Sequence, residues 1–576
     1  MRELLSKFRY QLADQQALLS YSLLGVVGGV ASALAVLAFE LAIFELGALL
    51  GVGNNADQFE TLPQWMLFAL PAGGAALLGV AYSLLQPADR ETGIVHVISR
   101  MHSHYSVLPL RNAVVQFLGG TFALASGQSG GREGPGVHLG GAANSLLGQW
   151  LGLPHNSLRV LVACGTAGGI AAVFHTPMAG VIFAMEVIVA EYTVIGFIPV
   201  MLAAVSATAV SRALSADSVL FSLPTIQMSS LLELPFIMLL GLACGVAAAA
   251  FIGLSTLAAR LAHWPVALRF TLAGCVTGGL ALLVPQVLGM GYDTLDLTLQ
   301  GELALATLAA IALGKILATA LSCGVGMPIG LIGPNLVIGA CIGAMFGSAA
   351  TAIQPELASD PTLYIVIGMA AAMGAVLNAP LAALLAVVEL TQTISIGMPA
   401  MLAIVTASLT NSGIFGQESA HRSVLRQLQR LVPQDPINQL LHRANVTRTM
   451  DTRVVRVPAL LRAEDLEPLL ESTPAWCVVT RGDDDLYLVD GAELIASLSQ
   501  MSLAERDAEL TETGIRRWTI APVSIRASLR EAMDSMRANT AEAVCVYEPS
   551  RISGKNILHG IITKEAIEKF TLSSVG

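Results

Sequence analysis

Charged residues are scarce in this sequence: only 12% of its 576 residues are Asp, Glu, Lys or Arg, while 54% are hydrophobic. A soluble globular protein of this length needs far more charge to cover its surface. Between residues 303 and 417 the charged residues are only Lys315, Glu356, Asp360 and Glu389. Such stretches supply several helices of membrane-spanning length, so the sequence predicts a polytopic protein in a lipid bilayer.

Other features that the sequence lacks narrow the function further. Seven cysteines are scattered without the spacing of metal ligands, and no paired nucleophile and base stands out, so neither a metal site nor an enzyme is predicted. The net charge of −10 comes mostly from the C-terminal part of the chain. The sequence therefore predicts no nucleic-acid partner.

Both ends of the apolar region carry basic residues: Arg2, Lys7 and Arg9 before it, and Arg422, Arg426, Arg430 and Arg443 after it. By the positive-inside rule, both termini are expected to face the cytoplasm, in what we expect to be a bacterial inner membrane. Residues 1–19 are amphipathic, and no small-residue cleavage site follows them. They predict a cytosolic surface helix and not a removable signal peptide.

The apolar region consists of two similar halves. GTAGGIAAVFHTPMAGVIFAME (165–186) aligns without a gap with GMAAAMGAVLNAPLAALLAVVE (368–389), and GREGPGVHLG (131–140) aligns with GLIGPNLVIG (330–339). The two motifs occur in the same order in both halves. Duplicated halves with Gly and Pro interrupting apolar segments at matching places predict a transporter whose ion site lies near mid-membrane at the repeat interface.

The Gly-x-x-Gly-Pro motifs at 131–135 and 330–334 predict two helix starts inside the apolar region. Glycine permits a tight backbone bend, and proline fits the first turn of a helix. Unpaired N–H groups at a helix start can replace the hydration of an anion without a full positive charge that would trap it. Broken helices at this depth must line a protected or watery path. These motifs therefore predict the passage of small inorganic anions.

Glu133 lies within the first motif, where an ionisable side chain in apolar surroundings is a functional candidate by default. As a carboxylate at a helix start, it is expected to compete with the permeating anion for the same N–H groups. Protonation would neutralise it and release the site, so we predict that Glu133 is the gate. The alternative is that Arg132 and Glu133 form an ion pair that only locks the loop.

These motifs resemble those of the CLC family of chloride channels and proton/chloride antiporters, over roughly residues 20 to 430. The resemblance implies a homodimer with one pore per subunit, each an all-α polytopic membrane domain of two inverted repeats (about 20–215 and 231–415) with tilted, broken helices. Glu133 matches the gating glutamate of the family. The segment ETGIVHV (91–97) stands in the place of the family's GSGIP segment, which puts Thr92 where a serine usually coordinates the ion. The candidate anion-binding residues are Thr92, Gly93, Gly131, Arg132, Gly330, Leu331, Ile332 and Gly333.

Three departures from the family pattern bear on mechanism. Val95 replaces the proline of the GSGIP segment, which leaves selectivity among chloride, nitrate, fluoride and bicarbonate open. Val187 follows Glu186 where family antiporters usually carry a second glutamate that passes protons from the cytosol. A gated channel is therefore the leading interpretation; the alternative is proton-coupled antiport along a non-standard path through Glu191 or Glu186. His421 falls near the place of the family's pore tyrosine, and is a candidate pore residue.

A change in composition beyond the last apolar helix marks a second domain. After a linker at 431–446, residues 447–576 contain two similar units, about 447–500 and 517–572, each expected to form a strand, a helix, two strands and a final helix. They resemble a tandem pair of CBS modules, which implies an α+β cytosolic domain and a candidate site for an adenine nucleotide. The family's Ser/Thr-x-x-Asp pattern appears here only as Asp490-Gly-Ala-Glu493 and Thr563-Lys-Glu-Ala566, so a scaffold that binds no nucleotide is the alternative. A CBS-linked cation transporter is disfavoured, because the carboxylates of the membrane region lie far apart in the repeats.

Overall fold

The computed structural model describes residues 18–52, 57–190, 194–214, 227–356, 358–430, 436–460, 469, 473–481, 484–500, 515–549 and 556–575. The predicted N-terminal surface helix falls almost entirely outside these residues. The chain divides into two compact units. The larger comprises Leu18–Leu151 and Leu158–Val432, and the smaller comprises Pro433–Gly576 together with Gly152–Ser157.

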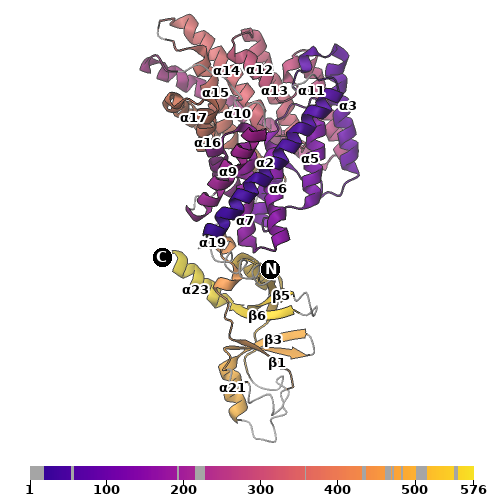
Figure 1. Cartoon of the computed structure of the whole chain (residues 1–576), viewed down its shortest axis with the longest axis vertical. Coiled ribbons are helices and arrows are strands. Elements are labelled where there is room, and N and C mark those ends of the chain that lie inside the picture. Colours follow the sequence, from indigo (N-terminus) through magenta and orange to yellow (C-terminus); the bar gives the residue numbers. More distant parts are fainter. Residues whose placement is uncertain are drawn as a thin grey trace. The chain divides into compact units, whose positions relative to one another are not determined.

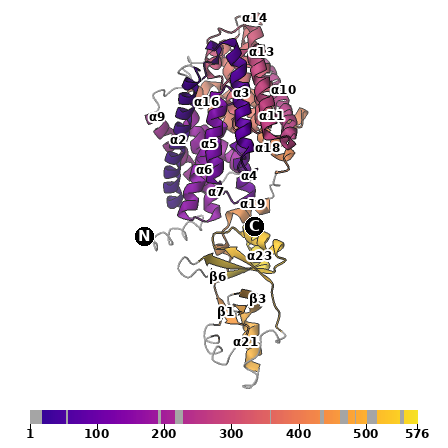
Figure 2. The same cartoon turned by 90° about the vertical axis from the view of Figure 1, so that its right-hand side faces the viewer.

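The larger unit is helical (Figures 1 and 2). In the described part of the chain, its α-helices form two series of eight and one further helix. The first series is α2 (Leu18–Leu49), α3 (Gln64–Ser83), α4 (Gly93–Ser103), α5 (Leu110–Ala125), α6 (Glu133–Leu151), α7 (His155–Phe174), α8 (Pro177–Phe183) and α9 (Val194–Leu214). The second is α10 (Leu234–Ala259), α11 (Val266–Ala281), α12 (Tyr292–Leu299), α13 (Leu305–Gly324), α14 (Ile332–Ile353), α15 (Pro361–Leu377), α16 (Pro380–Thr391) and α17 (Gly397–Leu409), followed by α18 (Ala420–Gln427).

Eight helical segments of the described residues are long and apolar enough to cross a membrane. The chain is therefore an integral membrane protein. The shorter helices α4, α8, α12 and α16 cannot span a bilayer alone. The breaks predicted at the two Gly-x-x-Gly-Pro motifs fall at the starts of α6 and α14. Helix α2 packs along α9 and α6, α10 packs along α17, and α3 packs along α11 from the other repeat.

The two repeats break their helices in the same way. His175 follows α7 and Asn378 follows α15, and both have a left-handed backbone, with φ of 57° and 51°. Two residues later Pro177 and Pro380 open α8 and α16, where a proline costs no helical hydrogen bond. The gapless alignment of 165–186 with 368–389 therefore corresponds to one three-dimensional motif that occurs twice.

Glu186 and Glu389 link the repeats reciprocally. Glu186 follows α8 in a π-helical turn, η2 (Ala184–Val189), and its carboxylate accepts hydrogen bonds from the amides of Leu381 and Ala382 at the start of α16 (3.4 and 2.9 Å). Glu389, near the end of α16, accepts hydrogen bonds from the first amides of α8, those of Met178 and Ala179 (3.0 and 2.8 Å). Each carboxylate thus caps the helix start of the other repeat, where unpaired N–H groups favour an anion.

The smaller unit contains two three-stranded sheets of the same design. The first is β1 (Val454–Pro458), β2 (Trp476–Arg481) and β3 (Asp484–Asp490), and the second is β4 (Ile520–Ser524), β5 (Ala543–Pro549) and β6 (Asn556–Thr563). In each sheet the first two strands are parallel and the third is antiparallel. The helices of this unit are α19 (Pro436–Arg443), α21 (Gly491–Gln500), α22 (Leu529–Ala538) and α23 (Lys564–Val575).

The two sheets are joined by backbone bridges and by an aromatic contact. The residue Asp451, which precedes β1, forms a bridge with Ile561 of β6, and Trp518, which precedes β4, forms a bridge with Leu488 of β3. Trp476 and Trp518 stack edge to face between the sheets, with ring centroids 5.4 Å apart. The small mixed sheets and their helices are compatible with a pair of CBS modules.

Candidate functional site

The two predicted helix starts meet directly. Gly131 and Gly330 form an antiparallel bridge, in which each amide donates to the carbonyl of the other residue, at 2.8 and 2.7 Å. A Cβ on Gly330 would lie only 2.6 Å from the amide nitrogen of Gly134, so the approach requires glycine. The bridge places the first residues of α6 and α14 side by side at the interface of the repeats. Because the amides of Gly131 and Gly330 are engaged in it, neither is an available anion donor.

Glu133 is the first residue of α6 and is fully buried. Its Oε1 accepts a hydrogen bond of 2.6 Å from the phenol of Tyr292, the first residue of α12, while its Oε2 has no hydrogen-bond partner. The carboxylate lies against the start of α14, because a Cβ on Gly333 would be 2.7 Å from Oε1. Among the described hydrogen bonds, the donor to this carboxylate is Tyr292 and not an amide of either helix start. Sequence reasoning did not identify Tyr292.

Arg132 pairs with Glu40 and not with its sequence neighbour Glu133. Its Nη1 lies 3.2 Å from Oε1 of Glu40 on α2, and its guanidinium lies over the ring of Tyr292, 5.4 Å from the ring centroid. The alternative of a locking pair between Arg132 and Glu133 is therefore wrong. The side chain of Arg132 pairs with Glu40, far away in sequence, and among the described residues no ion pair joins Glu133 to a cation.

The start of α14 supplies the amides that the anion hypothesis needs. Leu331 is the N-cap of this helix, and Ile332 and Gly333 follow as its first residues. The N–H groups of a first turn have no acceptor within their own helix. Asn335 and its side-chain amide bind the carbonyl of Leu331, which holds the turn in shape.

A cavity of about 610 Å³ in the larger unit reaches this helix start. Its wall includes three sites that the sequence singles out: Thr92, Leu331 and His421. Glycines 93 and 330 also line it, while Glu133 and Ile332 do not. Most other lining residues are apolar or glycine, and the charged ones are Arg90, Arg269, Arg430 and Glu91. The cavity is thus an electropositive approach to the helix starts, which favours anions.

Thr92 is the N-cap of α4, and its side chain makes no capping hydrogen bond. Gly93 follows with φ of 73°, and its amide donates to Oε1 of Gln116 at 2.6 Å. Gln116 on α5 also donates from Nε2 to the carbonyl of Pro328, at 2.9 Å. The amide of Gly93 is therefore used by the protein. Thr92 lines the cavity, and its hydroxyl lies within hydrogen-bond range of Tyr82.

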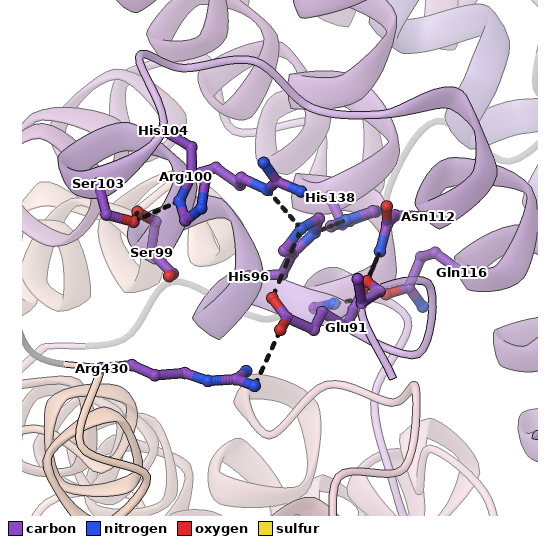
Figure 3. A network of polar contacts seen from close by, with 12 residues as sticks. Glu91, His96, Ser99, Arg100, Ser103, His104, Asn112, Gln116, His138 and Arg430 are labelled. Atoms are coloured by element: carbon purple, nitrogen blue, oxygen red, sulfur yellow. Dashed lines mark hydrogen bonds and ion pairs between the residues drawn. The ribbon is translucent and has the colours of Figure 1, made fainter. Parts of the chain in front are cut away.

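A buried polar network lies beside Thr92 on α4 (Figure 3). Nδ1 of His96 is 2.8 Å from Nε2 of His138 on α6, and the two rings stack with centroids 5.0 Å apart. Nε of Arg100 donates to Nε2 of His96 at 3.2 Å. Glu91, 3.9 Å from His96, is also paired with Arg430 at 2.9 Å. The two histidines are far apart in the sequence, and the packing of α4 on α6 brings them together.

The remaining candidate residues are Glu191, Glu186 and His421 of the membrane region and Asp490 of the smaller unit. Glu191 lies outside the described residues, and Glu186 is engaged in capping α16. His421 is buried on α18. In the smaller unit, Asp490 caps α21 by accepting from the amides of Ala492 and Glu493, so its carboxylate occupies the helix start. No group of three or more His, Cys, Asp or Glu that could hold a metal occurs among the described residues.

The family model of the voltage gated chloride channel matches residues 74–412, which is more than half of the chain and contains both helix starts. The chain belongs to the CLC family. It is 32% identical over 395 residues to a putative chloride channel protein ClcB-like of Ralstonia nicotianae, covering 66% of this chain and 91% of that protein. It is 31% identical over 395 residues to the H(+)/Cl(-) exchange transporter ClcA of Vibrio cholerae, covering 65% of this chain and 84% of that protein. CLC proteins move anions across membranes, so this chain is an anion-transport protein.

Solved CLC structures share the fold. A slow cyanobacterial Cl-/H+ antiporter superposes with a TM-score of 0.63 at 21% identity, covering 71% of this chain and 97% of that chain. A eukaryotic CLC transporter superposes with a TM-score of 0.61 at 19% identity, covering 96% of this chain and 99% of that chain. The membrane unit therefore has the CLC architecture of many tilted and broken helices.

Proposed function

We propose that this protein is a gated pathway for chloride or a similar small anion, with Thr92, Leu331 and Ile332 as ligands and Glu133 as the gate. The observation that carries the proposal is the position of the Glu133 carboxylate. It is fully buried, lies against the start of α14 and has one oxygen without a partner. Burying a carboxylate with one unpaired oxygen is costly, so the fold keeps an incompletely hydrogen-bonded acidic group at the point where the repeats meet.

The anion route follows from the placement of donors. An anion that enters the basic cavity meets the Thr92 hydroxyl and the amides at the start of α14, which together replace part of its hydration. The next obstacle is the Glu133 carboxylate, which repels the anion while it is charged. Protonation removes the repulsion and frees the carboxyl group to leave its seat, which opens the path.

The decisive experiment for the gate compares Glu133→Gln with the wild-type protein in liposomes loaded with chloride. We expect wild-type flux to rise as the pH falls and the flux of Glu133→Gln to be insensitive to pH, because the amide cannot titrate. Glu356→Gln is the matched control, since it removes an exposed carboxylate from the same unit. If Glu133→Gln keeps the pH dependence of the wild type, Glu133 is not the gate.

Proton-coupled antiport is the second candidate function, and two observations favour it. Several relatives are named H(+)/Cl(-) exchange transporters, and the stacked pair His96 and His138 continues inward from the cavity wall. Imidazoles in contact can pass a proton. Passive conduction is favoured by Val187, which has no proton to give, and by the engagement of Glu186 as a cap. Simultaneous recording of chloride and proton flux decides: uphill proton movement at a fixed ratio to chloride would overturn the channel.

We propose that the smaller unit is a tandem CBS pair that regulates transport. We also propose that the protein is a homodimer and that both termini of each chain lie in the cytoplasm. The support is the twofold repetition of its sheets and the bridges between them. Because Asp490 already caps α21, we expect adenine nucleotide to bind weakly or not at all. Titration of the full chain with ATP, read by thermal stability and flux, tests this; a saturable shift at micromolar ATP would contradict it. Chemical cross-linking in membranes tests the dimer, and a strictly monomeric product would refute it.

A further inference from the structure

The phenol that binds Glu133 belongs to a segment with unusual support. Asp57, which is almost fully buried, accepts hydrogen bonds from the amides of Met290 and Tyr292, each at 2.7 Å. One carboxylate oxygen serves each amide, and Gly291 between them has φ of 83°. Asp57 therefore fixes the turn that ends at Tyr292 and sets the direction in which its side chain leaves the backbone.

Lys315 binds the carbonyl groups of the same segment. This fully buried lysine of α13 donates to the carbonyls of Val287, Leu288 and Gly289, at 3.3, 3.5 and 3.4 Å. A buried acid thus binds the amides of the turn while a buried base binds its carbonyls. Burying two charges is expensive, so their use on one short turn indicates that its geometry matters.

The repeat explains why a residue at this position reaches the pathway. Lys315 and Gln116 stand at the same offset before Gly330 and Gly131, and Tyr292 and Gly93 stand at the same larger offset. In the first repeat, Gln116 holds the turn that presents Thr92 to the cavity. In the second repeat, Lys315 holds the corresponding turn, and it presents Tyr292 to Glu133.

We propose that Tyr292 is a positioning residue that latches the charged gate in its closed seat, an inference that rests on the proposed role of Glu133. The phenol donates a hydrogen bond, so it favours a carboxylate over a neutral carboxyl group. Oε2 is buried and accepts no hydrogen bond from the described residues, so it is the oxygen that a proton would occupy. The other titratable and charged groups near Glu133 are Arg132, its partner Glu40 on α2, and Cys323 on α13. Arg132 stays over the ring of Tyr292 and keeps it in orientation.

The test is the pH profile of anion flux in Tyr292→Phe. This variant keeps the ring beneath Arg132 and removes the hydroxyl, which donates to Glu133 and also interacts with the Arg132 side chain. The charged gate therefore loses its hydrogen bond, and less acid is needed to open it. We expect the pH of half-maximal flux to rise by about one to two units, which is the range given by a hydrogen bond to a charged group. Tyr364→Phe is the matched control, because Tyr364 on α15 also donates to a buried carboxylate, that of Glu233, away from Glu133. Its profile is expected to match the wild type.

The double variant Tyr292→Phe with Glu133→Gln separates the two proposals. If Tyr292→Phe shifts the profile, while Glu133→Gln is insensitive to pH and the double variant behaves like Glu133→Gln, Tyr292 acts through the gate. If Glu133→Gln is insensitive but Tyr292→Phe titrates like the wild type, the latch is wrong and the gate stands. If Glu133→Gln still titrates, the gate fails and the latch fails with it. A shift by Tyr292→Phe that persists without Glu133 also overturns the latch.

A second variant tests the support of the latch without touching the phenol. Asp57→Asn keeps one acceptor oxygen and loses the other, so the turn is held by fewer hydrogen bonds. We expect its pH of half-maximal flux to move in the same direction as that of Tyr292→Phe, by a smaller amount. In combination, the two changes are expected to shift the profile no further than Tyr292→Phe alone, because both act on one contact. Additive shifts would refute the coupling.

Discussion

Replacement of Gly330 by alanine tests the junction between the repeats. A Cβ at this position would lie 2.6 Å from the amide nitrogen of Gly134, 2.8 Å from the carbonyl oxygen of Gly131 and 3.0 Å from Oε2 of Glu133. Two of these neighbours are backbone atoms, which cannot rotate away. The strands of the bridge must therefore separate, and the two hydrogen bonds between Gly131 and Gly330 must lengthen or break.

The expected cost has two parts. Overpacking against backbone in a well-packed interior costs about 1–3 kcal/mol. Loss of two backbone hydrogen bonds adds about 0.5–1.5 kcal/mol each. Together, the free energy of unfolding is expected to fall by about 2–6 kcal/mol. Because the displaced atoms adjoin Glu133, the pH dependence of anion flux is expected to change in the same variant.

Unfolding in detergent micelles measures the first effect, and flux from liposomes measures the second. Gly279→Ala on α11 is the control, since a Cβ there meets no atom within 4 Å and the substitution favours the helix. If Gly330→Ala is as stable as Gly279→Ala and its flux keeps the wild-type pH profile, the close approach of the two helix starts is wrong.

Two further predictions concern the caps and the anion ligand. Glu389→Ala leaves the amides of Met178 and Ala179 without their acceptor and is expected to lower the free energy of unfolding by about 1–3 kcal/mol, with a similar loss for Glu186→Ala; equality of either variant with the wild type in micelle unfolding would contradict the capping. Thr92→Val keeps the shape of the side chain but removes its hydroxyl, so chloride affinity measured by calorimetry is expected to fall by about 3- to 10-fold, while Thr92→Ser retains it. Unchanged affinity in Thr92→Val would remove Thr92 from the site.

Much of the fold could be predicted because its signals are local. Runs of apolar residues predict the membrane helices, and the prolines at 177 and 380 mark helix starts that a proline tolerates. The alignment of the two halves predicted that 131 and 330 are equivalent, and the bridge between these glycines agrees with that equivalence. The meeting of Thr92, Leu331 and His421 around one cavity came from the family resemblance, since no local pattern links them.

The partners of the gate could not be predicted from local patterns. Arg132 pairs with Glu40, which lies on another helix, and adjacency in sequence suggested Glu133 instead. Tyr292 approaches Glu133 through the packing of a short helix of the second repeat. The repeat could have indicated Tyr292, because the alignment of the two halves, extended upstream of Gly330, places Tyr292 at the position of Gly93. Side-chain pairing between distant segments depends on tertiary packing, which periodicity and propensity do not encode.

The reciprocal caps at Glu186 and Glu389 have a mechanical consequence. A carboxylate of each repeat binds two amides at a helix start of the other repeat, and the backbone bridge between Gly131 and Gly330 is a third connection between them. A transport cycle in which the halves swing apart as rigid bodies would have to break all three ties at once. These contacts between the repeats instead favour a backbone that stays fixed while single side chains move. Access to the anion path then changes through the movement of one carboxylate.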